Sequence, residues 1–68
     1  MEVVKITTDY IKLEALMKFC AMAGTGGEAK MAIQKGLVFV NNEVCVQRGK
    51  KLRSGDTVEY GGTKMQIK

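Results

Sequence analysis

The sequence predicts a small α+β domain in which two packed helices lie against a small, mostly antiparallel sheet. Between residues 10 and 35, apolar residues recur at helical spacing on both sides of a glycine-rich break. From residue 37 onward, short alternating segments are separated by Asn-Asn, Ser-Gly-Asp and Gly-Gly, which are typical of tight turns between strands. A chain of 68 residues has room for one domain, and we expect residues 1–68 to form it.

The N-terminal part predicts a strand followed by a helix. Residues 2–7, EVVKIT, carry β-branched residues in rough alternation, as in a short strand. A helix is expected from about Tyr10 to Ala23, starting after Thr8-Asp9 and ending at Gly24. Its apolar face is formed by Leu13, Leu16, Met17, Cys20 and Ala23, with Phe19 at the border and expected to be buried.

A second helix is predicted from the capping box that Thr25 and Glu28 form, and it should run to Lys35. Gly36 then fits the left-handed position just beyond a helix. One face carries Ala29, Ala32 and Ile33, which are small enough to pack closely against the first helix. The rest of the surface is then left to Lys30, Met31, Gln34 and Lys35.

The C-terminal half predicts a hairpin and two further strands. Residues 37–41 alternate like a half-buried strand, in which Phe39 is expected to be buried, and Asn41-Asn42 suits a tight turn because asparagine tolerates positive φ. The remaining predicted elements are a return strand at 43–47, a strand at 57–60, a turn at Gly61-Gly62 and a closing edge strand at 64–68.

Positive charge is concentrated in the second half of the chain. The whole sequence has 11 Lys and Arg against 7 Asp and Glu, a formal net charge of +4. Residues 30–68 hold eight of the cations and three of the anions, which gives +5. The densest stretch, residues 48–53, places four cations around one apolar residue, Leu52. This uneven distribution of positive charge favours a polyanionic partner such as nucleic acid, although basic domains also use their charge for solubility.

The residue types argue against catalysis and against a metal site. The chain has no histidine, and Cys20 and Cys45 are far apart without a CxxC motif, so we expect both to be small core residues. No serine or cysteine stands beside a plausible base. We therefore expect no enzyme activity, no cofactor and no small-molecule substrate. The sequence also shows no apolar run long enough for a membrane span and no signal-peptide pattern, which predicts a cytoplasmic protein without membrane contact.

The order of residues resembles the RNA-binding domain named after ribosomal small-subunit protein S4, also called the alpha-L motif. The resemblance covers roughly residues 11–60 and is similar to the short stand-alone bacterial members of the family. It is carried by Lys12-Leu13, Glu28-Ala29-Lys30-x-x-Ile33, Gly36, Val38-x-Val40-Asn41 and Leu52-x-x-Gly55-Asp56-x-Val58.

This resemblance implies that the helix pair and the hairpin bind structured RNA, such as ribosomal or transfer RNA. We expect the protein to be a monomer. By motif position it implies RNA contacts for Lys12, Lys30 and Gln34, and Lys35 adjoins them. Charge rather than motif position adds Arg48, Lys50, Lys51 and Arg53. Many members carry Ser-Arg where this chain has Thr25-Gly26, so an arginine that usually contacts RNA is missing.

Two other functions fit parts of the sequence. Val38 to Glu59 resembles the C-terminal half of ubiquitin-like sulfur carriers, which end in Gly-Gly, but here Gly61-Gly62 is followed by six more residues. A carrier needs a free glycine carboxylate, so this function would require cleavage after Gly62. The second alternative is a protein-interaction module whose basic face binds an acidic partner.

Overall fold

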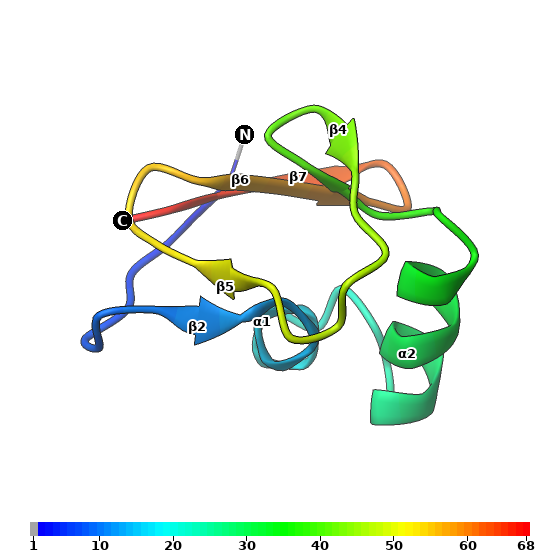
Figure 1. The fold of residues 1–68 in the computed structure, drawn as a ribbon. Helices are drawn as coiled ribbons and strands as arrows, with labels where there is room; N and C mark the ends of the chain where they lie inside the picture. Colours follow the sequence, from blue (N-terminus) through cyan, green and yellow to red (C-terminus); the bar gives the residue numbers. More distant parts are fainter. Residues whose placement is uncertain (1) are drawn as a thin grey trace.

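A five-stranded sheet with two helices on one of its faces is the frame of the molecule, in a computed structural model that describes residues 2–68 (Figure 1). The helices are α1, Leu13–Phe19, and α2, Gly26–Gln34. The strands of this sheet are β1 Glu2–Val4, β3 Phe39–Val40, β4 Glu43–Val44, β6 Thr57–Tyr60 and β7 Thr63–Ile67. A separate two-stranded ribbon consists of β2, Ile11–Lys12, and β5, Lys51–Leu52. The predicted α+β class is confirmed.

The sheet has the order β1-β7-β6-β3-β4 and is antiparallel except for the pair β1 and β7, which is parallel. The prediction that the last strand closes an edge is wrong, because β7 lies between β1 and β6. Backbone hydrogen bonds from Ile6 N to Lys68 O and from Lys68 N to Val4 O extend this parallel pairing. The two ends of the described chain are thus joined in one sheet.

Helix α1 is shorter than predicted at both ends. It begins at Leu13 because Ile11 and Lys12 pair with β5 instead of continuing the helix. It ends at Phe19, before the expected Gly24, because Ala21 adopts the left-handed conformation (φ 56°) and Met22 N bonds back to Met17 O at 2.8 Å. The residue in the left-handed conformation after this helix is therefore an alanine, although glycine is the usual residue there.

Helix α2 begins as the capping box predicts. The Glu28 backbone N–H donates to the Thr25 hydroxyl oxygen (3.1 Å), and the Glu28 carboxylate accepts from the Gly24 N–H (3.0 Å). The same carboxylate accepts from the Tyr60 hydroxyl at 3.2 Å, which attaches the start of α2 to strand β6. Gly36 follows the helix with φ 73°, as expected.

The core lies between the sheet and the helices. It is formed by Leu13, Leu16, Met17, Ala23, Ala29, Ala32, Ile33, Val38, Val40, Leu52, Val58 and Ile67. The predicted burial of Phe19 and Phe39 is wrong, since their side chains are 69% and 37% exposed. Phe19 lies beyond the buried face of α1, and Phe39 points to the outer face of the sheet because its neighbours Val38 and Val40 point inward.

The turns follow the predictions, while the return strand of the hairpin does not. Asn41 and Asn42 both have positive φ (51° and 69°), as a two-residue hairpin turn requires, and so do Gly61 and Gly62. Of the expected return strand at 43–47, only Glu43–Val44 is a strand, with one further bond from Cys45 N to Val38 O. The chain then leaves the sheet and runs to α1. This course brings the basic residues 48–53 next to the start of that helix.

Candidate nucleic-acid interface

The pairing of β2 with β5 brings basic residues from distant parts of the sequence together. Lys12 lies opposite Lys51, and Ile11 lies opposite Leu52 in an antiparallel register. Leu52 is fully buried, so it anchors the ribbon in the core and leaves the side chains of Lys51 and Arg53 exposed. We call Lys12, Arg48, Lys50, Lys51 and Arg53 the ribbon cluster.

The loop before β5 is fixed to the N-terminus of α1 by its backbone. Lys50 O accepts from Leu13 N at 2.9 Å, and Arg48 O accepts from Glu14 N at 3.2 Å. These carbonyls satisfy helix N–H groups that a capping side chain would otherwise serve, and Lys12 at the N-cap makes no such bond. Arg48 and Lys50 are thereby held beside Lys12.

A second group of hydrogen bonds fixes the turn that follows β5. The Asp56 carboxylate accepts from the Arg53 backbone N–H (2.8 Å) and from Asn41 Nδ2 (3.1 Å), and Asn41 Oδ1 accepts from Thr57 N (3.0 Å). The Arg53 bond is the main cause that lowers the pKa of Asp56, the Asn41 bond and the charges of Lys50 and Arg53 add to it, and partial burial opposes it. Asp56 is therefore a turn residue, and it holds Arg53 in place.

Tyr10 lies beneath two cations of the ribbon cluster. The residue is 37% exposed, and Lys51 Nζ lies 4.9 Å and the Arg53 guanidinium carbon 5.8 Å from the centroid of its ring. Tyr60 is half-buried and hydrogen-bonded to Glu28, and this burial, together with the Glu28 carboxylate, raises the pKa of Tyr60. Tyr10 instead belongs to the basic surface.

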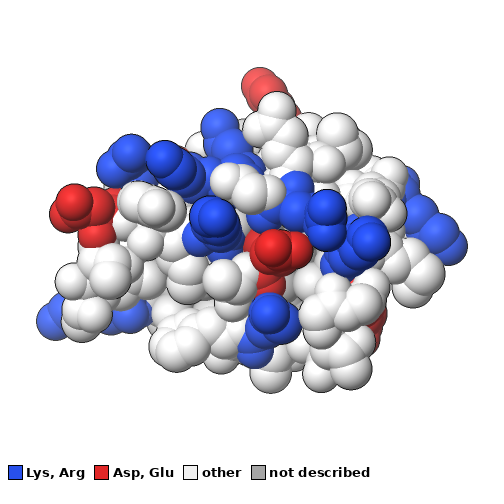
Figure 2. All heavy atoms as spheres, turned by 60° about the horizontal axis from the view of Figure 1, so that its bottom comes forward, with Lys and Arg blue, Asp and Glu red and all other residues white. Residues whose placement is uncertain are grey.

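The predicted contacts on α2 form a second group. Lys30, Gln34 and Lys35 are all exposed to solvent. Figure 2 shows Lys and Arg side chains distributed in several clumps over the face that carries the helices and the ribbon, with one acidic group near its centre. The structure thus places five of the eight predicted residues on the β2–β5 ribbon and its adjoining loops, and the other three on α2.

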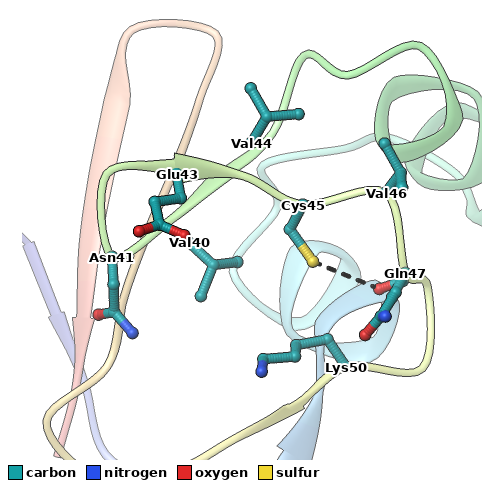
Figure 3. Close-up of a pocket in the computed structure, with 8 residues that line it drawn as sticks. All are labelled: Val40, Asn41, Glu43, Val44, Cys45, Val46, Gln47 and Lys50. Carbon is teal, nitrogen blue, oxygen red and sulfur yellow. Dashed lines mark hydrogen bonds between the residues drawn. The ribbon is translucent and has the colours of Figure 1, made fainter.

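A shallow hollow of about 440 Å³ lies between the β3–β4 hairpin and the loop that follows it (Figure 3). Cys45 Sγ points into it and donates to Gln47 O at 3.8 Å, and Lys50 lies at its lower rim. Cys20 and Cys45 are both free thiols that are half-buried against the core, as predicted for small core residues. Burial, with a smaller effect of the Glu2 charge, raises the pKa of the Cys20 thiol and so disfavours its nucleophilic form.

Residues 2–68 contain no cluster of His, Cys, Asp and Glu side chains that could bind a metal ion. Within the same residues, no helix has the length and apolar character needed to cross a membrane.

The sequence alone did not reveal three parts of this surface: Tyr10 beneath the cations, the carbonyls of Arg48 and Lys50 on α1, and the link between Asn41 and Asp56. Each joins residues that are more than ten positions apart. A local pattern of residues carries no signal for such contacts.

Comparison with known proteins gives two similarities. The family model described as S4 domain matches residues 4–68. A protein of Bacillus subtilis (strain 168) named "Probable ribosome maturation protein RlbA" is 37% identical over 59 residues, which are 87% of this chain and 83% of that protein. Both similarities extend across the ribbon, α1, α2 and the hairpin.

Proposed function

Because the chain belongs to the S4 domain family, we propose that it binds structured RNA, without catalysis, through the ribbon cluster and the exposed residues of α2. The observation that carries this proposal is the register of β2 and β5. It places Lys12 opposite Lys51, while the neighbouring loop is fixed to α1 and brings Arg48 and Lys50 to the same place. These four cations, with Arg53 two positions after Lys51, thus lie in segments that backbone hydrogen bonds hold next to one another.

Such a surface suits the phosphate backbone of RNA. Each Lys or Arg that neutralises a phosphate releases counterions, so the affinity falls steeply as salt is added. The loop and the ribbon are held by backbone hydrogen bonds, and ordering them on binding costs little additional conformational entropy. We expect recognition mainly by the shape and charge of the RNA backbone.

The name of the Bacillus subtilis relative ties that protein to ribosome maturation. We extend this role to the present chain and propose ribosomal RNA as its ligand, with transfer RNA as the next choice. Lys30, Gln34 and Lys35 would widen the contact along α2, where Gly26 takes the place of the arginine that the family resemblance leads us to expect.

The test is a salt-series titration of the protein against a folded ribosomal RNA fragment, duplex DNA of matched charge, and heparin. We expect the folded RNA to bind most tightly, with a logarithmic salt slope that corresponds to several phosphate contacts. Equal binding of all three polyanions would contradict the proposal, because the charge would then be generic. Binding to an acidic protein with no preference among polyanions would favour the interaction-module alternative.

The sulfur-carrier alternative meets a structural obstacle. Gly61-Gly62 forms the turn between β6 and β7, and cleavage after Gly62 would remove β7 with the buried residues Met65 and Ile67. The intact mass of the purified protein tests this alternative. A species ending at Gly62 would support it.

A further inference from the structure

We propose that Tyr10, Lys51 and Arg53 form a binding site for one unpaired nucleotide, in which the base stacks on the Tyr10 ring and the two cations bind the adjoining phosphates. This inference rests on the proposed RNA binding and adds a base contact to a surface otherwise assigned to backbone recognition. Its starting point is the position of an exposed aromatic ring directly beneath two cations.

The ring of Tyr10 is accessible and its backbone is held in place. The Thr8 hydroxyl donates to Tyr10 O at 2.8 Å, and Ile11, the next residue, begins strand β2. Beside the ring is an open hollow of about 570 Å³, lined by Thr8, Asp9 and Tyr10. A planar base therefore has an open approach to a ring whose backbone is ordered.

The other aromatic side chains lack this combination. Tyr60 is half-buried and donates its hydroxyl proton to Glu28. Phe39 lies on the outer face of the sheet, away from the helices and the ribbon. Phe19 is more exposed than Tyr10, but within the described residues no Lys or Arg lies over its ring.

The chemistry of the three groups fits a nucleotide better than it fits phosphate alone. An aromatic face stacks with any of the bases, whereas Lys51 and Arg53 attract the phosphates on either side of it. In the free protein the cations lie over the ring, where they gain a weak cation–π interaction. Binding would exchange this contact for a stacked base and two ion pairs, which is possible only for a base that is not held in a duplex.

Tyrosine fluorescence tests the stacking directly. The chain has two tyrosines and no tryptophan, so Tyr10 is the sole emitter in the Tyr60→Phe variant. We expect an RNA hairpin with an unpaired loop to quench this emission, and inorganic polyphosphate to bind without quenching it. Absence of quenching by the bound hairpin would overturn the inference.

Affinity measurements separate stacking from a merely structural role of the ring. We expect Tyr10→Leu to lose about tenfold in affinity for the looped hairpin, with an unchanged salt slope and less than a twofold loss for a fully paired RNA duplex of equal charge. Tyr10→Phe keeps the ring and should bind like the original protein. Phe19→Leu, which removes a more exposed ring outside the cluster, is the matched control and should also leave affinity unchanged.

Three results would count against the site in different ways. Equal losses for hairpin and duplex, with a flatter salt slope, would show that Tyr10 only positions Lys51 and Arg53. If the unaltered protein binds neither RNA, the proposed function itself fails. Normal RNA binding without quenching would reject the nucleotide site alone.

Discussion

Lys12 lies directly opposite Lys51 in the β2–β5 ribbon, and it also occupies the N-cap of α1, with an extended backbone (φ −73°, ψ 146°) and no capping hydrogen bond. Like charges at opposed positions of a strand pair are destabilising, and so is a cation at a helix N-terminus. Both the opposed charge of Lys51 and the helix N-terminus therefore make Lys12 lower the free energy of unfolding. Such a cost is expected of a residue that serves a ligand rather than the fold.

The first prediction is that Lys12→Asn makes the protein more stable and a weaker RNA binder. Asparagine removes the repulsion with Lys51 and the cation at the helix N-terminus, which should raise the free energy of unfolding by about 1 kcal/mol. Loss of one phosphate contact should flatten the logarithmic salt slope of RNA binding by roughly one unit. Urea unfolding and a salt-series titration measure the two effects.

Lys18→Gln is the control for this prediction. Lys18 lies in the last turn of α1, where a cation is favourable, four residues after Glu14. This variant loses the same charge from the same helix, but it should lose a few tenths of a kcal/mol of stability where Lys12→Asn gains stability. A Lys12→Asn variant that binds RNA as well as the original protein would remove Lys12 from the interface.

Local signals in the sequence were sufficient for the second helix and the turns. The capping box of Thr25 and Glu28, the left-handed Gly36 and the Asn41-Asn42 turn each depend on residues within a few positions of one another, and the structure confirms all three. The apolar period likewise identified the buried faces of both helices. These features are decided by backbone geometry and by side chains next to it.

Features that depend on distant pairing could not be obtained in this way. The start of α1 is set by Lys51-Leu52, which pair with the residues before it, and β7 is internal because the N-terminal strand adds to its far side. The site shows the same division. Charge and motif position indicated eight side chains. The position of the Tyr10 ring beneath Lys51 depends on the packing of residues that are far apart in the sequence, so no local pattern could predict it.

The second prediction compares the two groups of cations. If the ribbon cluster and α2 both contact RNA, Lys51→Ala and Lys30→Ala should each weaken binding and flatten the salt slope by roughly one unit. Lys64→Ala is a matched control, because Lys64 lies opposite Glu59 on the outer face of the sheet. Slopes that stay unchanged in both interface variants would exclude this face, and a change in Lys51→Ala alone would confine binding to the ribbon cluster.

The third prediction concerns acid unfolding. The pKa of Asp56 is lowered in the folded state, chiefly by the hydrogen bond from the Arg53 backbone N–H. Its ionised form therefore adds stability that is complete above the unfolded pKa, about 3.9, and that disappears as the pH falls through the lower folded pKa. We expect the free energy of unfolding to fall more between about pH 5 and pH 3 in the original protein than in Asp56→Asn.

Urea unfolding at several pH values within this window measures the difference. Asn41→Ala removes one of the two hydrogen bonds to the carboxylate and should give an intermediate pH dependence. Identical pH profiles for the original protein and Asp56→Asn would mean that other carboxylates govern acid unfolding.

The fourth prediction is that an arginine at position 26 strengthens RNA binding. Gly26 is the first residue of α2 and does not have a positive φ, and a Cβ there would lie 3.7 Å from Lys18 Cδ, an ordinary contact. Gly26→Arg should therefore fold without strain and add a cation at the position where the family resemblance leads us to expect one. We expect a several-fold gain in affinity and a salt slope steeper by roughly one unit, measured on the folded ribosomal RNA fragment.

Gly26→Gln separates the charge from the change in the backbone. Both substitutions reduce the freedom of the unfolded chain and should raise the free energy of unfolding by about 0.4–1 kcal/mol, less in the arginine variant because its charge lies at a helix N-terminus beside Lys18. Only the arginine variant should bind RNA more tightly. If the two variants bind equally, position 26 lies outside the RNA contact, and the absence of an arginine there costs this protein nothing in recognition.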